Sequence, residues 1–100
     1  MEITTNIDGA KATLTPVGKL TVQTAPELDT VISQLDAGIT ELNVDLSQLD
    51  YISSAGLRVL VSAQKMMVSR GGGLRLLSPN DDVYEVFDMT GLADVFTIVE

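Results

Sequence analysis

Two adjacent serines, Ser53 and Ser54, stand where an alternating apolar run gives way to a helical pattern. Residues 42–46 alternate with the period of a half-buried strand, and apolar residues recur at helical spacing over residues 57–68. A serine at such a junction usually serves as the helix N-cap, whose hydroxyl oxygen accepts a hydrogen bond from a free backbone N–H. A phosphoryl group on the second serine would meet further free N–H groups and the positive end of the helix dipole. The junction therefore admits both a simple helix cap and a phosphorylation site.

The other reactive side chains of the sequence do not assemble a catalytic centre. The chain has no His and no Cys, which removes the usual metal ligands, the usual triad base and any thiol nucleophile. Lys65 lies about three helical turns from Ser54, too far to act as its base. Asp45 and Asp50 precede the serines, but no residue here would serve as a general base for Ser54. We therefore expect a protein that is not an enzyme and that binds no metal ion or cofactor.

Composition and charge narrow the class of partner. One hundred residues with 45% hydrophobic and 20% charged side chains suffice for one folded domain. The formal net charge of −8 disfavours nucleic acid and anionic membrane surfaces, and it favours a basic or mixed-charge protein surface. The absence of cysteine, of a signal peptide and of any long apolar stretch predicts a cytoplasmic protein with no membrane insertion.

Strand and helix patterns alternate along the whole chain. The expected elements are strands at residues 2–7 and 10–17, a helix from residue 24 to about residue 38, a strand at 39–46, a turn at 47–51, a helix at 54–69, a strand at 74–77, a helix that begins at 78–81 and ends at 89–92, and a strand at 95–99. This ββαβαβαβ order predicts one α/β domain over residues 1–100, with a mixed, mostly parallel sheet and helices packed on it.

Local signals mark where these elements begin and end. Thr24 and Glu27 have the spacing of a capping box at the start of the first helix. Ser78 is the expected N-cap of the third helix, with a proline at its first position. Pro16 is expected to limit the ladder of the second strand or to end that strand. The glycines at 71–73 follow a helix, which is the wrong order for a phosphate-binding loop, so they predict a helix C-cap and a turn.

The helix expected at residues 54–69 carries apolar residues on more than one face. One stripe comprises Leu57, Leu60, Val61, Gln64, Met67 and Val68, a polar stripe comprises Arg58, Ser62, Lys65 and Ser69, and a third comprises Val59, Ala63 and Met66. A deeply packed helix would explain this distribution, and so would an exposed patch that contacts a partner. The sequence leaves both explanations open.

Three motifs of the chain belong together: Asp45-Leu46 followed by Tyr51-Ile52-Ser53-Ser54-Ala55-Gly56-Leu57, then Gly18-Lys19-Leu20, and Phe87-Asp88-Met89-Thr90-Gly91-Leu92. These motifs resemble those of the STAS domain, the family of bacterial anti-sigma factor antagonists. The resemblance covers nearly the whole chain and implies the fold described above. This chain departs from the family at Ser53, where members commonly have Asp, and at Lys19 and Thr21, where they often have acids.

The resemblance implies a switch at the head of the second helix. In that family a serine or threonine there is phosphorylated by an anti-sigma factor with a GHKL-type kinase fold, and a PP2C-type phosphatase restores the active form. The dephosphorylated protein binds the anti-sigma factor and frees sigma, so the switch regulates transcription. The matching residue is Ser54, with Ser53 as the alternative acceptor. The implied partner-binding residues are Ser53, Ser54, Ala55, Gly56, Arg58, Ser62 and Lys65.

A second interpretation belongs to a different functional class. Small STAS proteins also occur as adaptor subunits bound to ATPase components of lipid-transport systems, where the same serine or threonine region is a docking surface. The adaptor does not require phosphorylation, so phosphate incorporation separates the two interpretations. The length and acidity of this chain favour the switch, and antagonists of this size are expected to be monomers.

Overall fold

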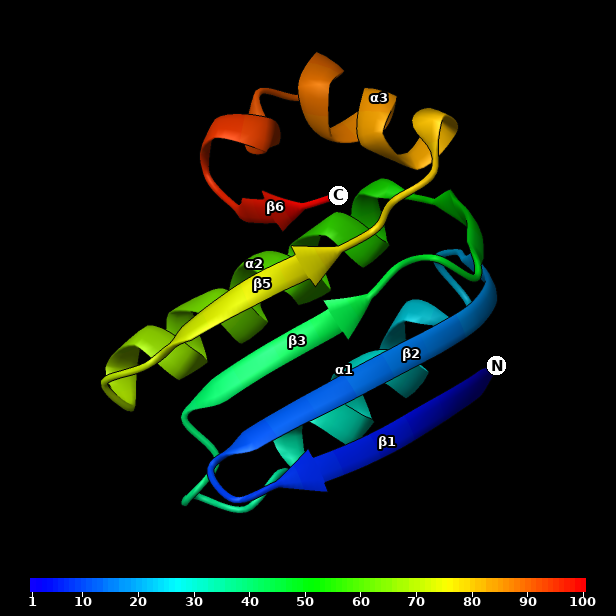
Figure 1. Ribbon diagram of the computed structural model, residues 1–100. Helices are drawn as coiled ribbons and strands as arrows, with labels where there is room; N and C mark the ends of the chain where they lie inside the picture. Colours follow the sequence, from blue (N-terminus) through cyan, green and yellow to red (C-terminus); the bar gives the residue numbers. More distant parts are fainter.

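Six strands and three helices follow one another in an order close to the expected one. In the computed structural model, which describes residues 1–100 (Figure 1), the elements are β1 (Glu2–Asp8), β2 (Lys11–Leu20), α1 (Ala25–Ser33), β3 (Glu41–Asp45), β4 (Leu49–Ile52), α2 (Ser54–Ser69), β5 (Gly73–Leu77), α3 (Asp81–Met89), the 3₁₀ turn η1 (Leu92–Asp94) and β6 (Thr97–Val99). The predicted α/β class is confirmed. The order is ββαββαβαβ, because the expected turn at 47–51 contains a strand.

The sheet is mixed, with its antiparallel pair at one edge. Its strand order is β1-β2-β3-β5-β6, in which β1 pairs antiparallel with β2 and the other neighbours run parallel. β3 lies between β2 and β5 and buries Leu42 and Val44, so the central position predicted from its apolar density is confirmed. The connections place α1 and α2 on one face of the sheet, and the opposite face carries no helix (Figure 1).

β2 pairs with two strands in succession. Residues 11–14 pair with β3, and Gly18, Lys19 and Leu20 pair with β4. Pro16 lies between these two ladders, so it limits the ladder without ending the strand. The register shifts after Gly18, which has a φ of +101°. Both ends of β4 are buried and its two middle residues are exposed. Because buried and exposed residues do not alternate in β4, the sequence pattern indicates a turn there.

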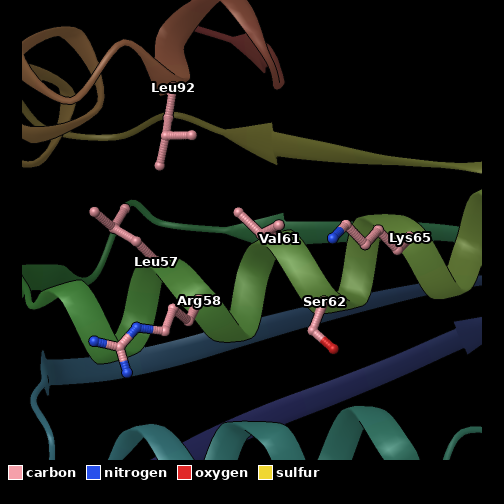
Figure 2. A pocket seen from close by; sticks show the side chains of 6 residues that line it. All are labelled: Leu57, Arg58, Val61, Ser62, Lys65 and Leu92. Carbon is pink, nitrogen blue, oxygen red and sulfur yellow. The ribbon is translucent and has the colours of Figure 1, made fainter.

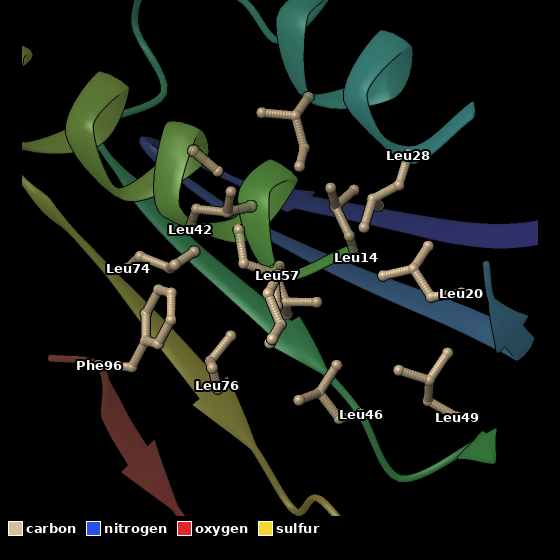
Figure 3. Packing of buried hydrophobic residues seen from close by; sticks show 14 of the residues in the cluster. Leu14, Leu20, Leu28, Leu42, Leu46, Leu49, Leu57, Leu74, Leu76 and Phe96 are labelled. Atoms are coloured by element: carbon tan, nitrogen blue, oxygen red, sulfur yellow. The ribbon is translucent and has the colours of Figure 1, made fainter. Parts of the chain in front are cut away.

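The core lies mainly between the sheet and the helices α1 and α2, and it continues to Val83 and Phe87 of α3. It contains 22 buried hydrophobic residues and no buried polar side chain. Figure 3 shows Leu14 and Leu42 from the sheet in the same layer as Leu28 from α1 and Leu57 from α2. Burying a side chain of this size contributes about 1.5–3 kcal/mol. Because successive strand residues face opposite sides, this core fixes the register of each strand.

The capping box predicted for α1 does not form, because the Thr24 hydroxyl makes its hydrogen bonds within the β2–α1 loop. Thr24 is the N-cap residue, but its hydroxyl makes no capping hydrogen bond. Instead the Thr24 Oγ1 accepts from the Thr21 backbone N–H at 2.8 Å and donates to the Lys19 carbonyl at 2.8 Å. The hydroxyl thus closes the loop behind the helix, and the Glu27 backbone N–H bonds to the Thr24 carbonyl at 2.9 Å.

The N-cap of α3 is Asn80, not the expected Ser78. The Asn80 Oδ1 accepts from the Val83 backbone N–H at 2.8 Å, and its Nδ2 donates to the Leu49 carbonyl at 3.1 Å. One side chain therefore caps α3 and also ties it to β4. Ser78 lies in the preceding turn with a φ of +52°.

The glycine-rich turn after α2 is a helix C-cap, as predicted. Gly71 adopts a φ of +86°, and its N–H donates to the Val68 carbonyl at 3.0 Å. The Gly72 N–H donates to the Met67 carbonyl at 2.9 Å, so two carbonyls left free at the helix end are satisfied. None of the three α-helices combines the length and the apolar character needed to cross a membrane.

Deep packing, the first of the two explanations for the apolar surface of α2, accounts for most but not all of it. The helix buries Gly56, Leu57, Leu60, Ala63 and Met67, and Val59, Val61 and Met66 are half-buried against the core. Deep packing therefore accounts for most of its apolar side chains. Val68, which the pattern groups with the buried stripe, is 60% exposed and is not explained by packing.

Candidate functional site

The β4–α2 junction carries the two serines and is anchored to the end of β2. The Ser53 backbone N–H donates to the Leu20 carbonyl at 2.8 Å, which continues the pairing of β2 with β4. Ser53 itself has extended backbone angles and is the N-cap of α2. Its Oγ accepts from the Gly56 backbone N–H at 3.2 Å. Ser53 is half-buried, and its hydroxyl serves the helix.

Ser54 is in a different situation, although it is the next residue. It is the first residue of α2, it is exposed, and its hydroxyl makes no hydrogen bond. The first turn of α2 contains no acidic residue. A negative group placed on Ser54 would therefore lie beside the positive end of the helix dipole, with no carboxylate in that turn to repel it.

Gly56 belongs to the packing beneath the junction and not to its surface. It is buried, and a Cβ built on it would lie 2.7 Å from Leu20 Cδ2, 2.8 Å from Leu20 Cγ and 3.0 Å from Ile52 Cγ1. The absence of a side chain lets the first turn of α2 sit close to the ends of β2 and β4. Burial leaves Gly56 little surface of its own, and its contact with a partner stays a prediction. Ala55 next to it is half-buried.

The remaining predicted contact residues share one exposed face of α2. Ser54, Arg58, Ser62 and Lys65 are all exposed and follow one another at intervals of three or four residues. The face extends about 16 Å from Ser54 to Lys65 at 1.5 Å per residue. In Figure 2, Arg58 and Ser62 point away from the neighbouring 3₁₀ turn. The structure thus brings these four residues together in one strip.

Two large hydrophobic side chains close in sequence to the ends of β2 and β4 are exposed and are absent from the sequence-based list. Tyr51 on β4 is 49% exposed, and it precedes Ser53 by two residues. Val22 is 71% exposed, and it follows Leu20, whose carbonyl binds the Ser53 N–H, by two residues. An apolar residue inside an expected turn is the signal that could have revealed Tyr51.

Of the two acidic residues near the junction, Asp45 has a local structural role. The Asp45 Oδ1 accepts from the Ser47 backbone N–H at 3.0 Å and so shapes the turn between β3 and β4. Asp50 is exposed on β4. Neither makes a hydrogen bond to Ser54. Ser54 therefore presents an exposed hydroxyl with no base of this chain hydrogen-bonded to it.

The fold and the junction together match a known family. Residues 1–100 match the STAS domain family along their whole length. This chain belongs to the STAS domain family. The anti-sigma-B factor antagonist of Bacillus subtilis is 33% identical to this STAS domain over 81 residues, which are 81% of this chain and 74% of that protein. The protein of the same name from Listeria monocytogenes is 34% identical over 83 residues, which are 81% of this chain and 72% of that protein.

Solved structures of proteins described as anti-sigma factor antagonists have the same architecture. A crystal structure of a Thermotoga maritima protein assigned as an anti-sigma factor antagonist matches with a TM-score of 0.90 and 26% identity, covering 98% of this chain and 86% of that one. The anti-sigma factor antagonist SpoIIAA in its unphosphorylated form matches with a TM-score of 0.77 and 18% identity, covering 99% and 89%. SpoIIAA has also been solved in its phosphorylated form.

Proposed function

We propose that this STAS domain is an anti-sigma factor antagonist that is switched off by phosphorylation of Ser54. Relatives that carry the name anti-sigma-B factor antagonist align with about four-fifths of the chain, which supports the proposal. SpoIIAA, which shares the fold, exists in a phosphorylated form. The observation that carries the proposal is the different use of two hydroxyls: Ser53 caps the helix, and Ser54 is free and exposed.

Residue 53 is a serine where STAS proteins commonly have an aspartate, and this difference agrees with a capping role for Ser53 and phosphorylation of Ser54. Serine and aspartate are equally good N-caps, because the side-chain oxygen of each accepts the same backbone hydrogen bond. Ser53 therefore keeps the capping function that an aspartate would have at this position, without its charge. Phosphorylation of Ser53 would convert the capping oxygen to an ester oxygen on a half-buried side chain, whereas phosphorylation of the exposed Ser54 would leave the cap unchanged. Ser54 is thus the favoured acceptor.

The phosphoryl group would disrupt the contact between this chain and its partner and would leave the fold of the chain unchanged. The kinase would transfer it from its nucleotide donor to the Ser54 Oγ and would take up the hydroxyl proton, since this chain offers no base. The new group carries about 1.5 to 2 negative charges at neutral pH. In the free protein this charge would lie at the helix N-terminus and in water. Against a closely packed partner it would be desolvated and would break the contact.

The partners follow from this role. The proposed kinase is an anti-sigma factor with a GHKL-type fold, and a PP2C-type phosphatase would remove the phosphate. The proposed contact surface comprises Ser53, Ser54, Ala55, Gly56, Arg58, Ser62 and Lys65, together with the exposed Tyr51 and Val22. The protein would act in the cytoplasm as a monomeric regulator of transcription, not as an enzyme.

Mass spectrometry of the protein from its native host tests the switch. We expect intact mass to show one phosphoryl group, and peptide mapping across residues 47–58 to place it on Ser54. The Ser54→Ala variant should lose the modification, and the matched Ser53→Ala variant should keep it. An unmodified protein under several growth conditions, purified together with an ATPase of a lipid-transport system, would instead establish the adaptor role.

A further inference from the structure

A continuous groove runs along α2 on the side that faces η1. It consists of two adjoining hollows of about 350 Å³ and about 410 Å³. Val61 and Lys65 line both hollows, so the groove extends from Leu57 to Ser69. The twelve residue steps from Leu57 to Ser69 correspond to about 18 Å of helix. Figure 2 shows Leu57 and Val61 pointing toward Leu92 of η1 across this groove.

The groove exposes apolar side chains that the core does not use. Val68 on α2 is 60% exposed, and Val95, on the opposite wall just after η1, is 52% exposed. Val61 and Leu92 between them are only half-buried. The two walls are held together, because the Gln64 Nε2 donates to the Val95 carbonyl at 3.1 Å. An edge-to-face contact of Phe87 and Phe96, 5.7 Å between ring centroids, fixes the outer wall further. The groove is preformed.

The rim of the groove carries an uncompensated positive charge. Arg58 and Lys65 are exposed, and no carboxylate lies within 4 Å of either, since the only ion pair joins the N-terminal ammonium to Glu27. α2 contains no acidic residue, although the chain has a net charge of −8. Two free cations beside an apolar strip form a surface that complements an acidic, apolar partner.

We propose that this groove binds an amphipathic helix of a partner protein with acidic residues along one edge. An extended peptide would need free backbone groups to pair with, but the main wall is a helix whose backbone bonds are internal. A partner helix satisfies its own backbone and can lay apolar side chains at helical spacing onto Val61, Val68 and Val95. Arg58 and Lys65 are seven residues apart, so the partner acids should also be about seven residues, or two turns, apart.

This inference rests on the proposed function only in assigning a protein partner to α2. It adds the chemistry of the partner segment that binds to α2 beyond Ser54. Its test needs neither a kinase nor a phosphate. A chain that is never phosphorylated in its host could still bind such a helix. A chain that is phosphorylated on Ser54 could fail to bind it. The two outcomes are therefore distinguishable.

Titration with designed peptides tests the inference on the full chain. The probe is an acetylated and amidated helical peptide of about four turns, with leucines on one face and two glutamates seven residues apart. The matched control replaces both glutamates with glutamine. We expect the acidic peptide to shift the backbone amide NMR signals of residues 57–69 and 92–95. The glutamine peptide should bind about tenfold more weakly, from the loss of two exposed ion pairs.

Variants of the chain locate the site. Val68→Glu should weaken binding of the acidic peptide at least tenfold, and because Val68 is exposed this change does not disturb the core. The double variant Arg58→Gln/Lys65→Gln should bind both peptides equally. Arg75→Gln, an exposed cation on β5, serves as the control and should leave binding unchanged.

Three results would overturn the inference. The first is that the acidic peptide causes no shift, or shifts signals only outside the groove. The second is that the wild-type chain binds both peptides with equal affinity. The third is that the groove signals depend on the concentration of the chain alone, which would show that a second copy covers it.

Discussion

At the scale of single residues, the junction separates a structural serine from a free one. The Ser53 Oγ satisfies a backbone N–H that would otherwise lack a partner in the first turn of α2. The Ser54 Oγ makes no hydrogen bond in the folded chain. Removal of the hydroxyl should therefore lower the stability of the fold at Ser53 more than at Ser54, although both residues are serines.

Alanine substitution of each serine measures this difference. We expect Ser53→Ala to lower the free energy of unfolding by about 1 kcal/mol through loss of the cap. Ser54→Ala should change it by less than about 0.5 kcal/mol, as for an exposed residue without contacts. Urea denaturation of both variants provides the comparison. Equal costs would show that both hydroxyls serve the fold and would weaken the assignment of Ser54 as the free acceptor.

Gly56 is a second position where one missing atom matters. Alanine there would place a Cβ 2.7–3.0 Å from the side chains of Leu20 and Ile52. Overpacking of this kind costs about 1–3 kcal/mol, partly offset by the better helix propensity of alanine. We expect Gly56→Ala to destabilise the protein by about 1 kcal/mol. Gly38→Ala is the matched control, because its Cβ would meet only Asp36 Oδ1 at 3.8 Å, and it should be nearly neutral.

At the scale of elements, the turn between α2 and β5 allows two strands to approach. A Cβ on Gly72 would lie 1.7 Å from the Thr40 carbonyl oxygen, which belongs to the backbone and cannot turn aside like a side chain. We expect Gly72→Ala to cost about 3 kcal/mol or more. Gly73→Ala, with nothing within 4 Å of its Cβ, should cost less than about 0.5 kcal/mol. Thermal unfolding of both variants tests this, and similar midpoints would contradict it.

Arg70 connects the same end of α2 to the loop after α1. Its guanidinium donates to the carbonyls of Asp36 and Ile39, each at 2.9 Å. Hydrogen bonds from a charged donor contribute more than neutral ones, so Arg70→Met should cost about 1.5–3 kcal/mol. Arg75→Met removes an arginine that makes no such bond and should be nearly neutral. Denaturation midpoints that coincide for the two variants would show that the Arg70 bonds do not stabilise the loop.

At the scale of the whole molecule, charge repulsion opposes folding. The chain has 14 acidic and 6 basic side chains, and its only ion pair is made by the N-terminal ammonium. Screening weakens repulsion between exposed charges more than about 10 Å apart. We expect the free energy of unfolding to rise by about 0.5–1 kcal/mol when NaCl increases from about 20 to about 300 mM. A fall over this range would show that attractive surface pairs outweigh the repulsion.

Most of the fold could be predicted from the sequence because its signals are local. The apolar period of α2 and the positive-φ turn after it depend only on nearby residues, and the bounds predicted for α2, residues 54–69, agree with the structure. The strand β4 could not be predicted, because its partner β2 lies about thirty residues earlier and a register shift removes its alternation. The caps of α1 and α3 likewise depend on contacts outside each helix.

The candidate site likewise has some features that follow from the sequence and others that depend on the tertiary structure. The sequence by itself determined that two serines begin a helix with no acid in its first turn, since residue order and helical spacing are enough to place them there. Only the tertiary structure decided which serine is free, that Gly56 of α2 is buried against Leu20 and Ile52, and that η1 forms the second wall of a groove on α2. Burial and hydrogen-bond partners depend on which distant segments meet, and no local pattern along the chain encodes that.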